Sequence, residues 1–317
     1  MLVSVMGDSM STFEGFIPEG WNVFYTGENC EATGVTTVDD TWWMQVIRGM
    51  GGEFLANASW SGSCVEGVGY PAGESRARTD ALQKDGAHPD VVLIFMGIND
   101  FGWGGTMNQM LGRGTATPTN IDLAKYPVVA PGPAPVDAAE KFGEAYSRML
   151  QNIVCDNPDV EVWCLTLPVG RIVGAPNTTF TYPYRGNHFD RYNNAIRVAA
   201  GQWPGCHVAD CRALMLDYEA VDGTHPTKRG MEQIASMVLH CMGLDDAPTD
   251  CPRSEQVCFQ ETCIGCPYAR GTAFGWNTVC ELSFPEPSFT NVRGVDAQAA
   301  PSGPAPKAQP WDPELSH

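Results

Sequence analysis

Three residues with the chemistry of acyl transfer lie far apart in the chain, one near its start and two more than two hundred positions later. Ser9 follows Val3–Met6, a mainly apolar run that is too short for a helix and breaks at a glycine. A hydroxyl alone is a poor nucleophile, so Ser9 would need a base and hydrogen-bond donors that stabilise an oxyanion. Asp222 and His225, spaced as Asp-x-x-His, have the residue types of an orienting carboxylate and its base. Together they predict nucleophilic chemistry at Ser9.

The strands expected around these residues would bring them together. Strands are predicted at the N-terminus, over residues 53–58 and over residues 91–96, and each leads into a loop of small polar residues. Ser9, Gly62 and Asn99 lie in those three loops. Because the carboxyl ends of parallel strands share one edge of a sheet, we expect these residues to meet there. The Asp222 loop follows the last strand and can fold back over the same edge.

The rest of the pattern alternates strands with helices, which predicts a three-layer α/β/α sandwich. The run over 91–96 is apolar without alternation, as in a strand covered on both faces of a parallel sheet. We expect about five parallel strands, the last two over residues 160–165 and 206–209. Helices are expected over residues 42–50, 74–83, 136–154, 190–200 and 227–242. Residues 12–38 are expected to be loop, and residues 101–135, rich in Gly, Pro and Thr, are interpreted as a lid.

Four short motifs, taken together, resemble the SGNH hydrolases, the GDSL-type esterase family. The resemblance spans roughly residues 2–242 and rests on Gly7-Asp8-Ser9, Asn57 to Gly62, Gly97-Ile98-Asn99-Asp100 and Asp222-Gly223-Thr224-His225. It implies the flavodoxin-like SGNH fold with a central parallel sheet. One departure is Ser59, where a glycine is common in the family, so the second loop is expected to differ slightly in shape.

The resemblance also implies a role for each residue of the site. Ser9 would be the nucleophile, His225 the general base and Asp222 the group that orients the imidazole. The backbone N–H groups of Ser9 and Gly62 and the side-chain amide of Asn99 would form the oxyanion hole. These roles imply a serine esterase that works through an acyl-enzyme without a catalytic cofactor. A small ester, either an acetylated carbohydrate or a short-chain acyl ester, is the expected substrate.

Two other functional classes stay open at the level of sequence. A non-catalytic carbohydrate- or partner-binding module could keep this fold without turnover, although every catalytic position is filled. A metal-dependent phosphoesterase would need an Asp-x-His near the start of the chain, and no Asp-x-His occurs. A second Asp-x-x-His, Asp85 to His88, precedes the strand over 91–96 and is therefore expected at the opposite edge of the sheet, as a structural turn.

Three aromatic residues flank the proposed oxyanion donors and have two interpretations of equal weight. Trp60, Phe101 and Trp103 could line an acyl or sugar pocket, or they could belong to the hydrophobic core.

The C-terminal region has a different composition and is expected to lie outside the catalytic domain. We predict an SGNH domain over residues 1–244, a Cys-rich extension over 245–296 and a disordered Pro/Ala-rich tail over 297–317. Of the twelve cysteines, five crowd into this extension: Cys251, Cys258, Cys263, Cys266 and Cys280. They could hold a structural zinc ion, but their odd number and single Cys-x-x-Cys pair leave disulfides or free thiols as alternatives.

Charge and hydropathy limit the partners. The net charge of −18 argues against nucleic acid and anionic membranes, because binding phosphate needs clustered Lys and Arg. No apolar run approaches the ~18 residues of a membrane span, and no leader or cleavage pattern is recognised. A cytoplasmic enzyme acting on a small-molecule ester is therefore expected.

Overall fold

The computed structural model describes residues 1–67, 71–103, 135–173 and 189–254, together with two short strands further on, β8 (Ala269–Arg270) and β9 (Val279–Cys280). Those two strands pair antiparallel. The expected lid lies almost entirely outside the described residues, as do most of the Cys-rich extension and the whole Pro/Ala-rich tail. The proposed domain boundaries therefore stay predictions.

A parallel sheet of five strands forms the centre of the described structure and confirms the predicted fold class. Its strands lie in the order β2-β1-β3-β4-β6 and every neighbouring pair is parallel. The strands are β1 (Leu2–Gly7), β2 (Glu53–Asn57), β3 (Val91–Phe95), β4 (Glu161–Leu165) and β6 (Cys206–Ala209). All five β3 residues are buried, which explains the unbroken apolar run in its sequence.

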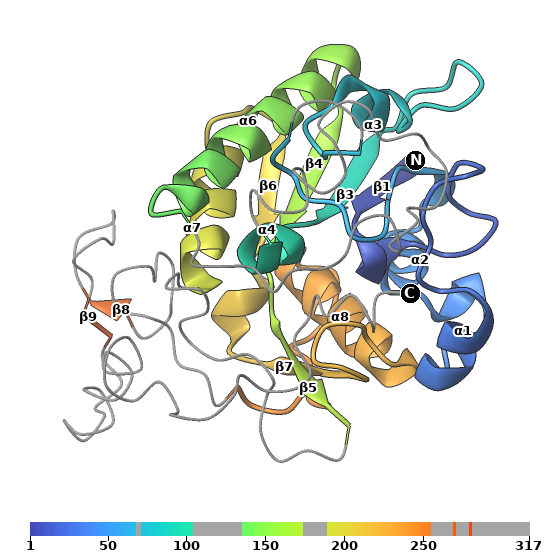
Figure 1. The fold of residues 1–317 in the computed structure, drawn as a ribbon, viewed down its shortest axis with the longest axis vertical. Helices are drawn as coiled ribbons and strands as arrows, with labels where there is room; N and C mark the ends of the chain where they lie inside the picture. Colours follow the sequence, from blue (N-terminus) through green and yellow to red (C-terminus); the bar gives the residue numbers. More distant parts are fainter. Residues whose placement is uncertain (68–70, 104–134, 174–188, 255–268, 271–278, 281–317) are drawn as a thin grey trace.

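Helices cover both faces of this sheet and complete the three layers (Figure 1). On one face α2 (Trp42–Gly49) packs against α8 (Lys228–Cys241). On the other face α6 (Ala138–Asp156) packs against α3 (Arg76–Asp80) and α7 (Phe189–Ala200). Each of the longer helices lies within two residues of its expected position at either end.

The helix expected over residues 74–83 is shorter than predicted. α3 spans five residues, and the chain then turns into a bridge between Lys84 and Ala87. The loop expected over residues 12–38 also needs correction, because it contains α1 (Gly27–Thr33). This seven-residue helix has no side-chain cap at its N-terminus and ends at Gly34, which adopts a left-handed conformation. A helix this short leaves little periodicity in the sequence.

Two features near the carboxyl edge of the sheet lie outside the sequence expectations. The first is α4 (Ile98–Trp103), which begins directly after β3. The second is a parallel pair formed by β5 (Val169–Ile172) and β7 (Asp217–Ala220). β7 ends two residues before Asp222, so this small sheet leads directly into the Asp222 loop.

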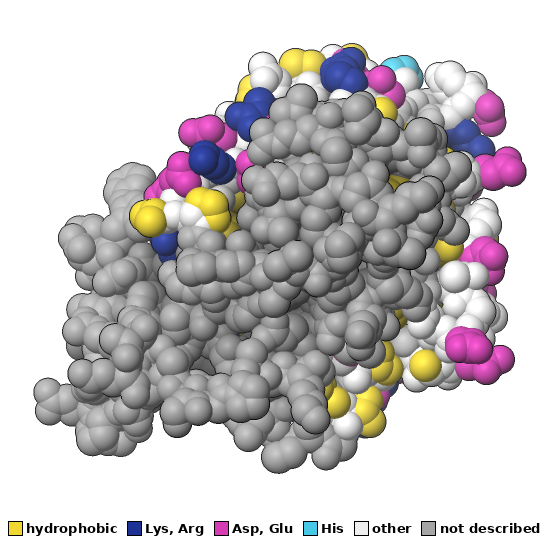
Figure 2. Space-filling model, viewed as in Figure 1, with side chains coloured by type: hydrophobic (Ala, Val, Ile, Leu, Met, Phe, Trp, Pro, Cys, Tyr) yellow, Lys and Arg dark blue, Asp and Glu magenta, His cyan; other side chains and the backbone are white. Residues whose placement is uncertain are grey.

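Charged side chains of both signs share the visible surface of the described residues. Where described residues are visible in Figure 2, along its upper and right-hand rims, Lys and Arg side chains lie among Asp and Glu side chains and form no continuous basic patch. Within the described residues, no helix is long and apolar enough to cross a membrane.

Candidate active site

The nucleophile loop is a tight turn at the end of β1. Asp8 caps the short 3-10 helix Ser9–Ser11 and accepts a hydrogen bond of 3.1 Å from the Met10 N–H. The Thr12 hydroxyl donates to the Ser9 carbonyl over 3.0 Å and closes the turn. Ser9 is thereby held at the carboxyl edge of the sheet with a buried side chain.

The base loop follows β7 and is organised by Asp222. One Asp222 carboxylate oxygen accepts the backbone N–H groups of Thr224 and His225, each at 2.8 Å. The other oxygen lies 2.5 Å from His225 Nδ1. Gly223, between them, has φ of 92°, which favours glycine. The loop therefore fixes both the position and the orientation of the imidazole.

The two loops meet at a single hydrogen bond. His225 Nε2 lies 2.9 Å from Ser9 Oγ, across 216 positions of sequence. Because the Asp222 carboxylate is an acceptor for Nδ1–H, Nε2 is left to accept the serine proton. Both His225 and Asp222 are almost completely buried. The structure thus brings together the three residues that the sequence singled out.

The charge state of Asp222 suits this arrangement. Burial alone would raise the pKa of the Asp222 carboxyl, but the adjacent His225 and the two backbone N–H donors outweigh burial and lower it below the usual value. In the neighbouring Asp8 carboxyl, the effect of burial on the pKa outweighs the effects of the groups that lower it. Burial raises the Asp8 pKa to about 7, against the opposing effects of the Met10 N–H, His225 and Arg78.

The expected oxyanion donors lie in the loops after β2 and β3. Gly62 has φ of 80°, and the Asn99 amide at the start of α4 donates to the Ser63 carbonyl over 3.1 Å. Among the described residues, the N–H groups of Ser9 and Gly62 have no protein acceptor, and Asn99 retains a second amide hydrogen. Donors without internal partners are what an oxyanion site requires.

A buried carboxyl connects these two loops. Asp100 accepts the N–H groups of Val65 and Glu66 at 2.9–3.1 Å, which ties the start of α4 to the chain just beyond Gly62. Burial raises the Asp100 pKa to about 8. Ser59, at the position where the family commonly has glycine, is buried and donates its N–H to the Asn57 side chain over 2.9 Å.

The structure describes the side chains of two of the three aromatic pocket candidates. Trp60 and Phe101 are fully buried, and Phe101 packs edge-to-face against Phe189 and Tyr192. The Trp103 side chain lies outside the described residues. A role for these residues in a substrate pocket therefore stays a prediction.

The second Asp-x-x-His is at the other end of the sheet. His88 precedes β3, and its Nδ1 lies 2.9 Å from the Asn157 side-chain oxygen, close to the end of α6. This placement agrees with the structural turn that the sequence predicts.

Two residues at the site escaped the sequence analysis. The Phe24 ring stacks on His225 with the ring centroids 3.6 Å apart and the planes 7° from parallel. Arg78 is fully buried and donates to the carbonyls of Gly7, Ala58 and Pro71 at 2.6–2.8 Å. It thereby supports the chain just before the nucleophile turn and on both sides of the oxyanion loop. Neither residue belongs to a motif, so no local signal could have identified it.

The zinc prediction falls mostly outside the described residues. Cys251 is half-buried and packs against the core, whereas the side chains of the other four candidates are not described. Within the described part of the chain, no group of His, Cys, Asp and Glu could hold a metal ion.

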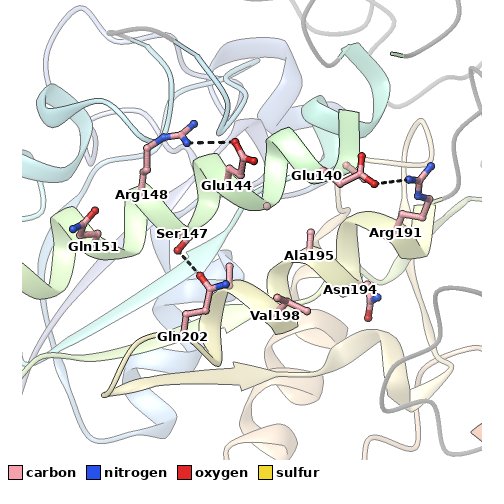
Figure 3. Close-up of a pocket in the computed structure, with 13 residues that line it drawn as sticks. Glu140, Glu144, Ser147, Arg148, Gln151, Arg191, Asn194, Ala195, Val198 and Gln202 are labelled. Atoms are coloured by element: carbon pink, nitrogen blue, oxygen red, sulfur yellow. Dashed lines mark hydrogen bonds and ion pairs between the residues drawn. The ribbon is translucent and has the colours of Figure 1, made fainter. Parts of the chain in front are cut away.

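A separate groove of about 440 Å³ lies between α6 and α7 (Figure 3). An ion pair between Arg191 and Glu140 and a hydrogen bond from Ser147 to Gln202 span the two helices. Ser147 has no histidine beside it there, and none of the three residues Ser9, Asp222 and His225 lines this groove. It is distinct from the candidate active site.

The parallel sheet, with serine, histidine and aspartate at its carboxyl edge, defines an α/β protein of the hydrolase type. The family model of GDSL-like lipases and acylhydrolases matches residues 1–130, which include Ser9, Gly62 and Asn99. Over those residues the chain is similar to this family, which supports an esterase-type hydrolase.

Solved structures with related folds were found at low sequence identity. A GDSL-like protein from Bacteroides ovatus is 22% identical, with a TM-score of 0.46 over 77% of this chain and 98% of that one. One from Bacteroides uniformis is 22% identical, with a TM-score of 0.49 over 76% and 95%. A family two carbohydrate esterase from Clostridium thermocellum is 13% identical, with a TM-score of 0.41 over 77% and 65%. No curated protein sequence matched the chain. These similarities do not assign an activity to this chain.

Proposed function

We propose that the chain is a serine esterase that hydrolyses a small ester through an acyl-enzyme intermediate. The observation that carries the proposal is the hydrogen-bonded series from Ser9 Oγ to His225 Nε2 and from His225 Nδ1 to Asp222. The family's description as lipases and acylhydrolases supports an ester as the substrate. An acetylated carbohydrate or a short-chain acyl ester is the substrate class that we propose.

The first half of the reaction forms the acyl-enzyme. Ser9 Oγ attacks the ester carbonyl while His225 Nε2 takes the hydroxyl proton, and Asp222 stabilises the imidazolium that results. The oxyanion of the tetrahedral intermediate accepts hydrogen bonds from Ser9 N–H, Gly62 N–H and the Asn99 amide. His225 then gives its proton to the leaving alcohol as the carbon–oxygen bond breaks.

The second half releases the acid. A water molecule gives a proton to His225 and attacks the acyl carbonyl, and the resulting oxyanion is held by the same three donors. When the intermediate collapses, the proton returns to Ser9 Oγ. His225 carries every proton transfer and Asp222 holds the imidazole in place, so the proposed mechanism needs no metal or cofactor.

A fluorophosphonate probe tests the proposal directly. The wild-type protein should be labelled at Ser9 and should hydrolyse p-nitrophenyl acetate, and Ser9→Ala should abolish both. A chelator should leave the hydrolysis unchanged, whereas a metal-dependent phosphoesterase would lose its activity. Folded wild-type protein that neither reacts with the probe nor cleaves any ester in a chain-length series would favour the non-catalytic binding module.

A further inference from the structure

A four-residue segment between β1 and α1, residues 22–25, contacts all three loops of the candidate active site. We call it the bracing segment. It belongs to none of the four sequence motifs, and it lies in the stretch that the sequence predicts to be loop. It stacks an aromatic ring on the base and forms hydrogen bonds with the nucleophile turn and the oxyanion loop.

Toward the base, the bracing segment supplies an aromatic face and a hydrogen bond. The Phe24 ring lies flat against the His225 imidazole, with the centroids 3.6 Å apart. Rotation of the imidazole out of the plane that faces Ser9 and Asp222 would drive it into this ring. The adjacent Tyr25 hydroxyl donates to the Pro226 carbonyl over 2.9 Å and fixes the chain just after the base.

Toward the nucleophile, the connection runs through Thr12. Its hydroxyl donates to the Ser9 carbonyl over 3.0 Å and accepts the Phe24 N–H over 2.9 Å. One buried hydroxyl therefore joins the nucleophile turn to the residue that stacks on the base. A second bond, from the Glu14 N–H to the Tyr25 carbonyl at 3.1 Å, runs alongside it.

Toward the oxyanion loop, Asn22 makes a reciprocal pair with Ser61. The Ser61 N–H donates to the Asn22 carbonyl over 2.9 Å, and the Asn22 amide donates to the Ser61 carbonyl over 3.1 Å. Ser61 directly precedes Gly62. Since the Ser61 carbonyl and the Gly62 N–H belong to the same peptide unit, this pair sets the direction in which the Gly62 N–H points.

We propose that the bracing segment is a positioning element for the reaction, which holds the His225 ring, the Ser9 turn and the Gly62 peptide in one arrangement before substrate binds. Phe24 is its central residue, because it contacts the base directly and the nucleophile turn through Thr12. The inference rests on the proposed esterase function. Errors of about 1 Å in such an arrangement can reduce a rate by about 10²-fold.

The test compares Phe24→Leu with Phe24→Tyr, using a p-nitrophenyl ester and the folded fraction measured by near-ultraviolet circular dichroism. Leucine keeps apolar volume but lacks a flat face, so kcat per folded molecule should fall about 10–100-fold while KM changes less than about two-fold. Tyrosine keeps the ring and should recover kcat to within about three-fold of wild type. The matched control is Phe54→Leu, in an aromatic cluster with Phe16 and Trp43, which should keep kcat.

Asn22→Ala provides an independent arm if Phe24→Leu does not fold. Asn22 is only half-buried, so its truncation should leave the fold intact while loosening the Ser61–Gly62 peptide, and kcat should again fall with KM unchanged. Wild-type kcat in Phe24→Leu, or in Asn22→Ala where the first does not fold, would overturn the positioning role and leave the esterase proposal standing. Wild-type protein without esterase activity would instead overturn the proposed function itself.

Discussion

Gly170 on β5 lies so close to Gly223 that a methyl group on its Cα would overlap the Gly223 carbonyl oxygen. This contact joins the small β5–β7 sheet to the centre of the loop between Asp222 and His225. The loop's shape therefore depends on a residue more than fifty positions away that carries no side chain.

Gly170→Ala should displace the base loop. The added methyl group has to move backbone rather than a flexible side chain, so we expect kcat for ester hydrolysis to fall at least about 100-fold. Gly201→Ala is the matched control, because its Cβ would approach neighbouring carbonyls only to ordinary contact distance. Comparable activity in the two variants would show that the loop adapts without cost.

Asp222→Asn should reduce kcat by about 10⁴-fold while the protein stays folded. An asparagine amide facing His225 Nδ1 would favour the tautomer with its proton on Nε2, which can no longer accept the Ser9 proton. Steady-state kinetics and the rate of fluorophosphonate labelling should fall together. Asp250→Asn, which removes an exposed partner of Arg229, should change neither rate.

Arg78→Met should destabilise the protein by about 3–5 kcal/mol, because buried carbonyls lose their donor and each unpaired group costs about 1–3 kcal/mol. Chemical denaturation gives the free energy of unfolding. Arg76→Met, in the same helix, removes an exposed ion pair with Asp156 and should cost no more than about 1 kcal/mol. Equal losses in the two variants would contradict this account of Arg78.

Asp8 should make the protein less stable as the pH rises from about 4 to about 7. Burial raises the Asp8 pKa from 3.8 to about 7, so the folded state binds more protons than the unfolded state across this window. The resulting contribution to stability is complete below the unfolded pKa and is lost as the pH passes the folded one. Asp8→Asn should flatten this slope in thermal unfolding between pH 4.5 and pH 7.5, and an unchanged slope would contradict a buried, protonated Asp8.

Thermal unfolding extended below pH 4 should show the opposite trend, with stability falling as the pH falls. The pKa of Asp222 is lowered in the folded state, so its contribution to stability is lost as the pH falls below about 4. This loss should be present in both the wild-type protein and Asp8→Asn.

Local patterns in the sequence were sufficient for the main sheet. The run at Val91–Phe95 is apolar throughout because both faces of that strand are buried, and this property is readable from consecutive residues. The five strands and the longer helices follow from such runs. The β5–β7 pair does not, because four-residue strands leave too short a pattern.

The sequence by itself determined which residue types are available for chemistry and which loops carry them, since Ser9, Asp222 and His225 are recognisable from their neighbours and spacing. Only the tertiary structure decided that these residues lie within hydrogen-bonding distance, that Phe24 stacks on the base and that Arg78 supports the loops around the nucleophile. The reason is physical. A contact across many positions depends on how whole elements pack, and no short stretch of sequence records which distant side chain or glycine will lie against it.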